Sequence, residues 1–391
     1  MKKTSIIIGA DLVPTKSNLK MFCDASVDKI FGKELIDILD SSDIKVFNLE
    51  CPLIDYESPI KKCGPVLGIN KDVIKGIKEI NPSCLCLANN HIMDHGSEGL
   101  KSTIDTLEKN NIEYCGVGNN INSLHTNWVA NVGNLKICVY ACAEHEFSIA
   151  NEDTPGANPF NVLKVYEEIN QLSKINDFVI VLYHGGKEFY PYPSPNLQNY
   201  CRKFIDYGAD FVVCQHSHCI GSKELYNNKY IIYGQGNFIF DDGTNSYDWN
   251  HGLLIDLSIS KKHSVDSICY HVLERKDNVV RLADEQESNI IINNFEKRSK
   301  EISNNNFVKN NYSQFCEENL YNLLRKFDLI GNSIVFRALN KFTKQKFGKF
   351  YFKKIYLRKK SYDLQNVLEC EAWNELALTG IKKYNEIENK R

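Results

Sequence analysis

Two imidazoles one residue apart, at the end of an apolar run, are the side chains of this sequence best suited to chemistry. His216 and His218 follow the strand-like segment 210–214. Two side chains on a loop that leaves a buried strand can both point at one site. Imidazole is the commonest metal-binding side chain and the usual acid or base near neutral pH. The pair therefore predicts a metal or acid–base site at a strand end.

Polar side chains end four earlier strand-like runs in the same way. The terminal residues of these runs are Asp11, Glu50, Asn90 and His184. In an open α/β sheet, ligands collect at the carboxyl ends of the strands, so all six side chains are expected at one edge. This mixture of oxygen and nitrogen donors suits Zn, Mn or Fe, and two divalent ions rather than one. One such residue alone is more often an ordinary loop residue, so the prediction depends on the whole ordered set.

The elements expected to position these side chains alternate between strand and helix from residue 5 to about 258. Helix-like spacing occurs at 33–39, 72–80, 98–110, 160–175 and 195–207. Each of these segments precedes a strand-like run, which predicts βαβ crossovers and mostly parallel pairing. Segments 229–233 and 252–259 follow more closely and are expected to be antiparallel neighbours, with Asn227 and Asn228 as a turn signal.

Bulk composition excludes several classes of protein. The chain has 391 residues, of which 25% are charged and 43% apolar, and its net charge is -2, so we expect no nucleic-acid partner. No apolar run approaches the length of a membrane span, and the short run after Met1 is too brief for a secretion signal. The 14 cysteines are scattered, and Cys84 and Cys86 alternate within a strand. We therefore expect a cytoplasmic location and cysteines that are reduced and mostly buried as small apolar residues.

The C-terminal part differs in composition, and we expect two regions, a domain at 1–284 and a helical region at 285–391. Segment 337–360 contains ten lysines and arginines, six aromatic residues and no acidic residue. One interpretation is a helix with a solvated basic face and a buried aromatic face. The alternatives are docking to an anionic polymer or sugar phosphate, and peripheral binding to an anionic membrane surface.

Taken in order, six motifs resemble the CapA family, the bacterial poly-gamma-glutamate and capsule biosynthesis proteins. The motifs are Gly9-Ala10-Asp11, Asn48-Leu49-Glu50-Cys51-Pro52, Asn89-Asn90-His91-Ile92-Met93-Asp94-His95-Gly96, Tyr183-His184-Gly185-Gly186, Gln215-His216-Ser217-His218 and Tyr233-Gly234-Gln235-Gly236-Asn237-Phe238. That family is similar in turn to the calcineurin-like metallophosphoesterases. The likeness covers roughly residues 4–258.

The resemblance implies an α/β fold, a four-layer α/β/β/α metallophosphoesterase-like sandwich with a two-metal site at the sheet edge. It implies a first metal held by Asp11 and His218, a bridging Glu50, and a second metal held by Asn90, His184 and His216. Val13 stands where these phosphoesterases usually carry a further histidine.

The same resemblance implies that His91 is the general acid and that Asp94 orients it. Asn237 is either a substrate contact, as the resemblance implies, or a structural residue of a tight turn with Gly234 and Gly236. His145, between Glu144 and Glu146, is a further side chain that could reach the site.

Two functions follow from these expectations. The favoured one is a metal-dependent hydrolase in capsule or poly-gamma-glutamate-type polymer biosynthesis, acting on a phosphoester or on an amide of the polymer. The alternative is a non-catalytic binding or assembly factor of a polymer synthase, which Val13 favours. The expected partners are an anionic polymer or phosphoester substrate, and a synthase complex or membrane surface that binds 337–360.

Overall fold

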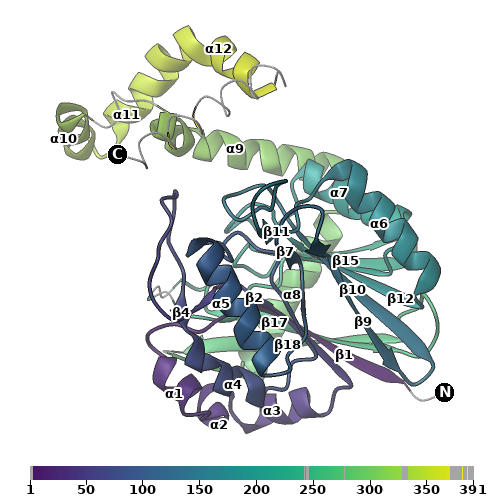
Figure 1. Ribbon diagram of the computed structural model, residues 1–391. Helices are drawn as coiled ribbons and strands as arrows, with labels where there is room; N and C mark the ends of the chain where they lie inside the picture. Colours follow the sequence, from purple (N-terminus) through teal and green to yellow (C-terminus); the bar gives the residue numbers. More distant parts are fainter. Residues whose placement is uncertain are drawn as a thin grey trace. The chain divides into compact units, whose positions relative to one another are not determined.

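The computed structural model describes residues 3–241, 243, 246–276, 278–327, 333–369, 381 and 385 (Figure 1). The chain forms two compact units, residues 1–309 and residues 310–391. Among the described residues, every helix is too short or too polar to cross a bilayer.

The first unit contains an eight-stranded mixed sheet with the order β19-β18-β17-β1-β2-β5-β6, and β16 also pairs with β1. Its strands are β1 (Thr4–Val13), β2 (Ile44–Leu49), β5 (Cys84–Cys86), β6 (Tyr114–Cys115), β16 (Asn237–Phe240), β17 (His251–Ile259), β18 (Ser267–Lys276) and β19 (Val279–Leu282). Strands β1, β2, β5 and β6 are parallel, so their carboxyl ends lie at one edge.

A second, six-stranded sheet has the order β14-β15-β13-β12-β10-β9. Its strands are β9 (Asn127–Val132), β10 (Leu135–Ala143), β12 (Phe178–His184), β13 (Phe211–Gln215), β14 (Lys223–Tyr226) and β15 (Lys229–Tyr233). Strands β10, β12, β13 and β15 are parallel. Five short strands complete the set: β3 (Leu53–Ile54), β4 (Ile69–Asn70), β7 (Val117–Gly118), β8 (Leu124–His125) and β11 (Gly156–Ala157).

The predicted pairing of 229–233 with 252–259 is wrong, because β15 and β17 belong to different sheets. The turn signal itself is correct, since Asn227 and Asn228 have φ of 49° and 60° and join β14 to β15 as a hairpin. Alternating apolar residues show that a segment is a strand, but they do not identify the strand that pairs with it.

Side chains of the second sheet alternate between two apolar layers. Ile180 and Leu182 of β12 pack in the main core with the first sheet, whereas Val181 packs against α6 (Val162–Ile175) and α7 (Pro195–Asp206). The outer face of the first sheet is covered by α1 (Leu19–Cys23), α2 (Val27–Phe31), α3 (Lys33–Asp40), the 3-10 turn η1 (Lys71–Val73), α4 (Ile74–Glu79) and α5 (Gly96–Lys109). Figure 1 shows α6 and α7 on one side of the sheets and α1, α3 and α4 on the other. The predicted four-layer α/β/β/α sandwich is confirmed.

Helix α8 (Glu285–Glu301) begins at Asp284, whose side chain accepts a hydrogen bond from the Glu287 amide. It buries Ile291 and Phe295 in the main core. Helix α8 therefore belongs to the first compact unit, which extends to residue 309, beyond the boundary expected between residues 284 and 285. The expected division into domains stays a prediction.

The second unit is helical over its described residues, as the sequence predicted. Its elements are most of α9 (Asn305–Phe327), α10 (Ile334–Phe342), α11 (Lys346–Tyr351), a π-helical turn η3 (Phe352–Tyr356) and α12 (Leu357–Glu369). Segment 337–360 is therefore several helical pieces rather than one helix. Phe336 and Phe352 form a small buried cluster, whereas Phe342 and Phe350 are exposed. The side chains of Arg358, Lys359 and Lys360 lie outside the described residues.

Candidate metal centre

Asp11 is fully buried near the carboxyl end of β1, two residues before the strand ends at Val13. Asn48 donates a hydrogen bond from Nδ2 to Asp11 Oδ1 at 2.8 Å, and Asp11 Oδ2 has no hydrogen-bond partner. The β1–β2 register shifts between Ile8 and Asp11, and such an irregularity re-aims the side chain that follows. Gly9 lies within the shift, where a Cβ would overlap the ring of Phe47. The apolar run thus ends with a carboxylate oxygen left for another ligand.

Glu50 lies just beyond β2 and is also fully buried. Neither of its carboxylate oxygens has a hydrogen-bond partner, although Oε1 lies 3.3 Å from His184 Nε2. A buried carboxylate without partners is costly unless a cation is close to it. Glu50 therefore indicates a position for positive charge.

His184, the last residue of β12, lies between the donors of the first sheet. Its Nε2 is 3.0 Å from Asn90 Oδ1, and its Nδ1 is 3.2 Å from Asn48 Nδ2 and 4.0 Å from Asp11 Oδ1. The two sheets thus bring Asp11, Asn90 and His184 together at their adjoining edges.

His216 and His218 follow β13 with φ of 90° and 50°. Non-glycine residues in this left-handed region cost about 1–3 kcal/mol each, and such strain concentrates at functional sites. His218 Nδ1 is 2.9 Å from Asn237 Oδ1 and 3.6 Å from Asp11 Oδ2. The ligand atoms of Glu50, His216 and His218 lie within 4.8 Å of one another, and His216 Nδ1 is buried without a partner.

Burial and the charges of neighbouring side chains shift the pKa values of Asp11, Glu50 and His216. Burial, and then the charge of Glu50, raise the pKa of Asp11 to about 7. Burial also acts to raise the pKa of Glu50, but His184 outweighs it and holds this pKa below its usual range. Burial, followed by the charges of His184 and His218, lowers the pKa of His216 well below its usual value. A neutral His216 keeps a lone pair available for a metal ion.

His91 and Asp94 form a connected pair next to Asn90. His91 Nδ1 lies 2.6 Å from Asp94 Oδ2, and the Leu67 amide donates to the same oxygen at 2.6 Å. The His91 amide donates to Asn89 Oδ1 at 3.1 Å, and Asn89 in turn donates to the Leu49 carbonyl, next to Glu50.

Lys62 was not recognised as a site residue from the sequence. Its Nζ lies 2.6 Å from Asp94 Oδ1 and 3.3 Å from His91 Nδ1, and its side chain is only 2% exposed. It comes from the irregular segment between β3 and β4, which has no periodicity or motif that could mark it.

Glu144 and Glu146 form a second acidic group beside the donors. Glu144 Oε1 is 3.6 Å from His216 Nε2, and Asn90 donates from Nδ2 to Glu146 Oε2 at 3.1 Å. The two glutamates and His216 also place ligand atoms within 4.8 Å of one another. Glu144 directly follows β10, as several of the predicted donors follow their own strands, and this position is the signal that marks the pair in the sequence.

Asn237 and Val13, the two remaining positions named from the sequence, do not belong to the metal donors. Asn237 contacts His218 and also donates from Nδ2 to the Trp249 carbonyl at 3.3 Å, so it supports the histidine. Val13 is buried in the main apolar core and is in register with Phe240, so the position carries no donor.

The residues present fit a divalent metal ion. The six predicted donors come together, and four buried atoms with no hydrogen-bond partner belong to them: Asp11 Oδ2, Glu50 Oε1, Glu50 Oε2 and His216 Nδ1. Carboxylate and amide oxygens combined with imidazole nitrogens are the donors that Zn, Mn and Fe accept.

Comparisons with known proteins concern the same part of the chain. The model of the family described as "Bacterial capsule synthesis protein PGA_cap" matches residues 7–242. The "Capsule biosynthesis protein CapA" of Bacillus anthracis is 31% identical over 216 residues, covering 52% of this chain and 52% of that protein. The "PGA biosynthesis protein CapA" of Bacillus subtilis is 30% identical over 215 residues, covering 53% and 55%. The match spans about half the length of these relatives.

A "Probable polyglutamine synthesis accessory protein" of Mycobacterium tuberculosis is 26% identical over 225 residues, covering 53% of this chain and 59% of that protein. Among solved structures, a phosphatase from Mycoplasma pneumoniae superposes with a TM-score of 0.44 at 16% identity, covering 71% of this chain and 95% of that one.

Proposed function

The chain belongs to the family of bacterial capsule synthesis proteins, and on that premise we propose that it is a metal-dependent hydrolase of capsule or poly-gamma-glutamate-type polymer biosynthesis. We propose a phosphoester as its substrate. The observation that carries the proposal is Glu50, a buried carboxylate that lies among three imidazoles and whose two oxygens accept no hydrogen bond.

In this proposal the residues divide into two metal positions. Asp11 and His218 would hold one ion, Asn90, His184 and His216 would hold the other, and Glu50 would serve both. Divalent ions there would supply Lewis acidity and neutralise the charge of an anionic substrate. The distances that support the grouping are those from Asp11 Oδ2 to His218 Nδ1, 3.6 Å, and from Asn90 Oδ1 to His184 Nε2, 3.0 Å.

His91 is the proposed general acid. Its Nδ1–H donates to Asp94, which fixes the ring and leaves Nε2 to deliver a proton to the leaving oxygen of the substrate. Lys62 holds the other carboxylate oxygen of Asp94, so Asp94 cannot rotate away from the imidazole. Asp94 and Lys62 act through His91 in this mechanism and do not touch the substrate.

A second candidate function is a binding or assembly factor of a polymer synthase. Val13 favours it, because a buried apolar side chain stands where a further metal ligand would be expected. The name of the Mycobacterium tuberculosis relative, a synthesis accessory protein, supports a synthase or polymer partner. In either function, the exposed lysines of 337–360 are the proposed contact for an anionic partner. A cytoplasmic location stays a prediction, and so does the expectation that the protein does not bind nucleic acid.

Hydrolysis assays separate the two candidates. The protein is loaded with Mn or Zn, and its turnover of a phosphomonoester and a phosphodiester model compound is compared with that of chelated protein. Metal-dependent turnover supports the hydrolase. Full metal content without turnover of either compound, or of a poly-gamma-glutamate chain, supports the assembly factor.

A further inference from the structure

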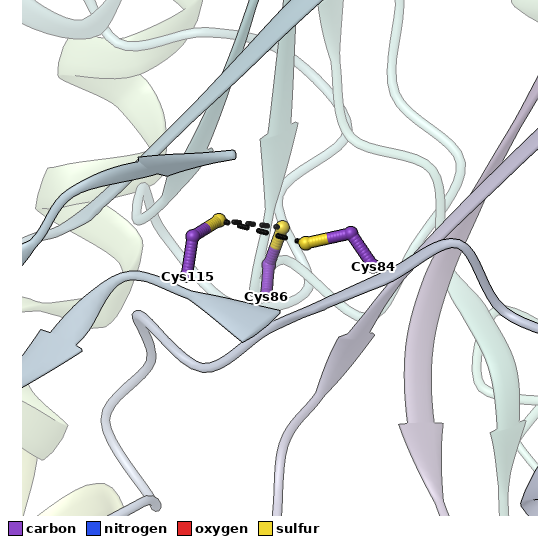
Figure 2. Close-up of side chains that lie close together, drawn as sticks. All are labelled: Cys84, Cys86 and Cys115. Atoms are coloured by element: carbon purple, nitrogen blue, oxygen red, sulfur yellow. Dashed lines mark hydrogen bonds between the residues drawn. The ribbon is translucent and has the colours of Figure 1, made fainter. Parts of the chain in front are cut away.

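Three thiols that do not belong to the donor set of the candidate metal centre lie in contact inside the first sheet. Cys84 and Cys86 belong to β5 and Cys115 belongs to β6. Cys115 Sγ is 3.9 Å from Cys84 Sγ and 3.7 Å from Cys86 Sγ, and Figure 2 shows the three sulfurs directed toward one another. All three side chains are buried.

Strand geometry explains why the thiols meet. Cys84 and Cys86 are two residues apart, so both point to the same face of β5. Cys86 and Cys115 are in register on parallel strands, which places Cys115 on that face as well. Cys84 is also in register with Val46 of β2, and both side chains pack in the main core. The three sulfurs on β5 and β6 therefore lie close together. Their proximity depends on the pairing of these two strands, which a sequence pattern does not reveal.

The spacing of the sulfurs matches that of thiolates around one ion. A metal–sulfur bond of about 2.3 Å separates neighbouring sulfurs by about 3.8 Å in a tetrahedral site and about 4.0 Å in a planar one. The observed separations, 3.7 and 3.9 Å, fall at these values, and the three sulfurs lie within 4.8 Å of one another. An ion could therefore enter with only small side-chain movements.

We propose that Cys84, Cys86 and Cys115 form a second cation site, which binds one soft monovalent ion, Cu(I), through three sulfurs. Thiolate sulfur selects Cu(I), whereas the carboxylates and imidazoles of the candidate metal centre select harder ions. The two sites would therefore be filled independently. The proposal does not depend on the hydrolase function.

The number of ligands favours Cu(I) over zinc. Among the described residues, the group contains three metal-ligating side chains, all of them cysteines. A structural zinc site takes four protein ligands, whereas Cu(I) accepts three sulfurs.

An ion would reach the buried sulfurs through local opening at the edge of the sheet. Strand β6 has two residues and is the terminal strand of the order, held to β5 through the Leu85 and Leu87 amides. Short edge strands open locally at a fraction of the global unfolding free energy. Opening of β6 moves Cys115 and exposes the other two thiols.

The chain offers a matched control in another pair of buried thiols. Cys201 Sγ and Cys214 Sγ are 3.4 Å apart on α7 and β13. Among the described residues, these two are in no group of three metal-ligating side chains. A general affinity of buried cysteines for Cu(I) would thus appear at this pair as well.

Anaerobic competition for Cu(I) tests the proposal. Reduced, chelator-treated full-length protein is titrated against a chromogenic Cu(I) chelator. We expect the wild type to retain one Cu(I), Cys86→Ala and Cys115→Ala each to bind it at least about 100-fold more weakly, and Cys201→Ala to match the wild type. Circular dichroism establishes that each variant is folded.

X-ray absorption at the copper edge of the wild type gives an answer that needs no variant. Three sulfur neighbours at one equivalent of Cu(I) are expected. The proposal is overturned by nitrogen or oxygen neighbours, by the lack of a stoichiometric site, or by equal losses in Cys86→Ala and Cys201→Ala.

Discussion

Lys62 Nζ lies 2.6 Å from Asp94 Oδ1, and both side chains are almost completely buried. The other oxygen of Asp94 accepts from His91 Nδ1 at 2.6 Å. A lysine from an irregular loop and a histidine after β5 therefore share one carboxylate. The position of the proposed general acid depends on that shared carboxylate.

We expect Lys62→Met to lower the free energy of unfolding by about 3 kcal/mol, because it leaves the buried Asp94 charge without its cation. Chemical denaturation followed by circular dichroism measures the change. Lys61→Met is the control, since Lys61 is exposed. Equal stability of the two variants would show that the buried ion pair contributes nothing.

His91→Gln removes the proposed proton donor without removing any of the six metal donors. We expect turnover of a phosphoester to fall by about 10²–10⁴-fold while the metal content stays that of the wild type. Steady-state assays and elemental analysis of the same preparation measure both quantities, and His125→Gln, at an exposed histidine, serves as the control. Wild-type turnover in His91→Gln would remove His91 from the mechanism.

The sequence predicted those site residues that directly follow an apolar run. Asp11, Glu50 and His184 each end such a run, and parallel strands bring their ends to one edge, so their convergence was predictable. Lys62 lies in a loop 32 residues before Asp94, and nothing in its neighbourhood marks it. Cys115 likewise meets Cys86 only through the β5–β6 register, which is a property of the folded sheet.

The fold, too, could be predicted from local pattern but not where it depends on which strands pair. The five expected helices and the parallel strands follow from local periodicity, and each of them is present. The pairing of 229–233 with 252–259 failed, because a hairpin with β14 and the neighbouring β13 satisfy β15 within the second sheet. Local pattern therefore predicted the elements, and the family resemblance implied the four layers, but the pattern did not predict how the strands are divided between the two sheets.

Gly9 provides a test of the backbone that positions Asp11. A Cβ at this position would overlap the Phe47 ring, so we expect Gly9→Ala to destabilise the protein by about 1–3 kcal/mol. The double variant Gly9→Ala/Phe47→Leu should recover part of that loss, because the smaller side chain vacates the space. Thermal or urea unfolding measures both. Wild-type stability of Gly9→Ala would contradict the close packing described here.

The exposed lysines at 349, 353 and 354 test the proposed contact with an anionic partner. We expect the wild type to co-sediment with an anionic polymer at low salt and the triple Lys→Gln variant to bind on the order of 100-fold more weakly, since each lysine near a negative surface contributes about 1 kcal/mol. The same change at Lys29, Lys33 and Lys78, three exposed lysines of the first unit, is the control. Equal binding by both triple variants would exclude this segment as the contact.

Elemental analysis of the purified protein tests the central claim most directly, that donors from two sheets converge on cations. Wild-type protein equilibrated with Mn or Zn and then desalted should carry one to two ions per chain. The double variant His184→Ala/His216→Ala should carry none, and Glu152→Gln, at an exposed glutamate, should match the wild type. A wild type without bound metal, or a double variant that retains its ions while folded, would contradict the account.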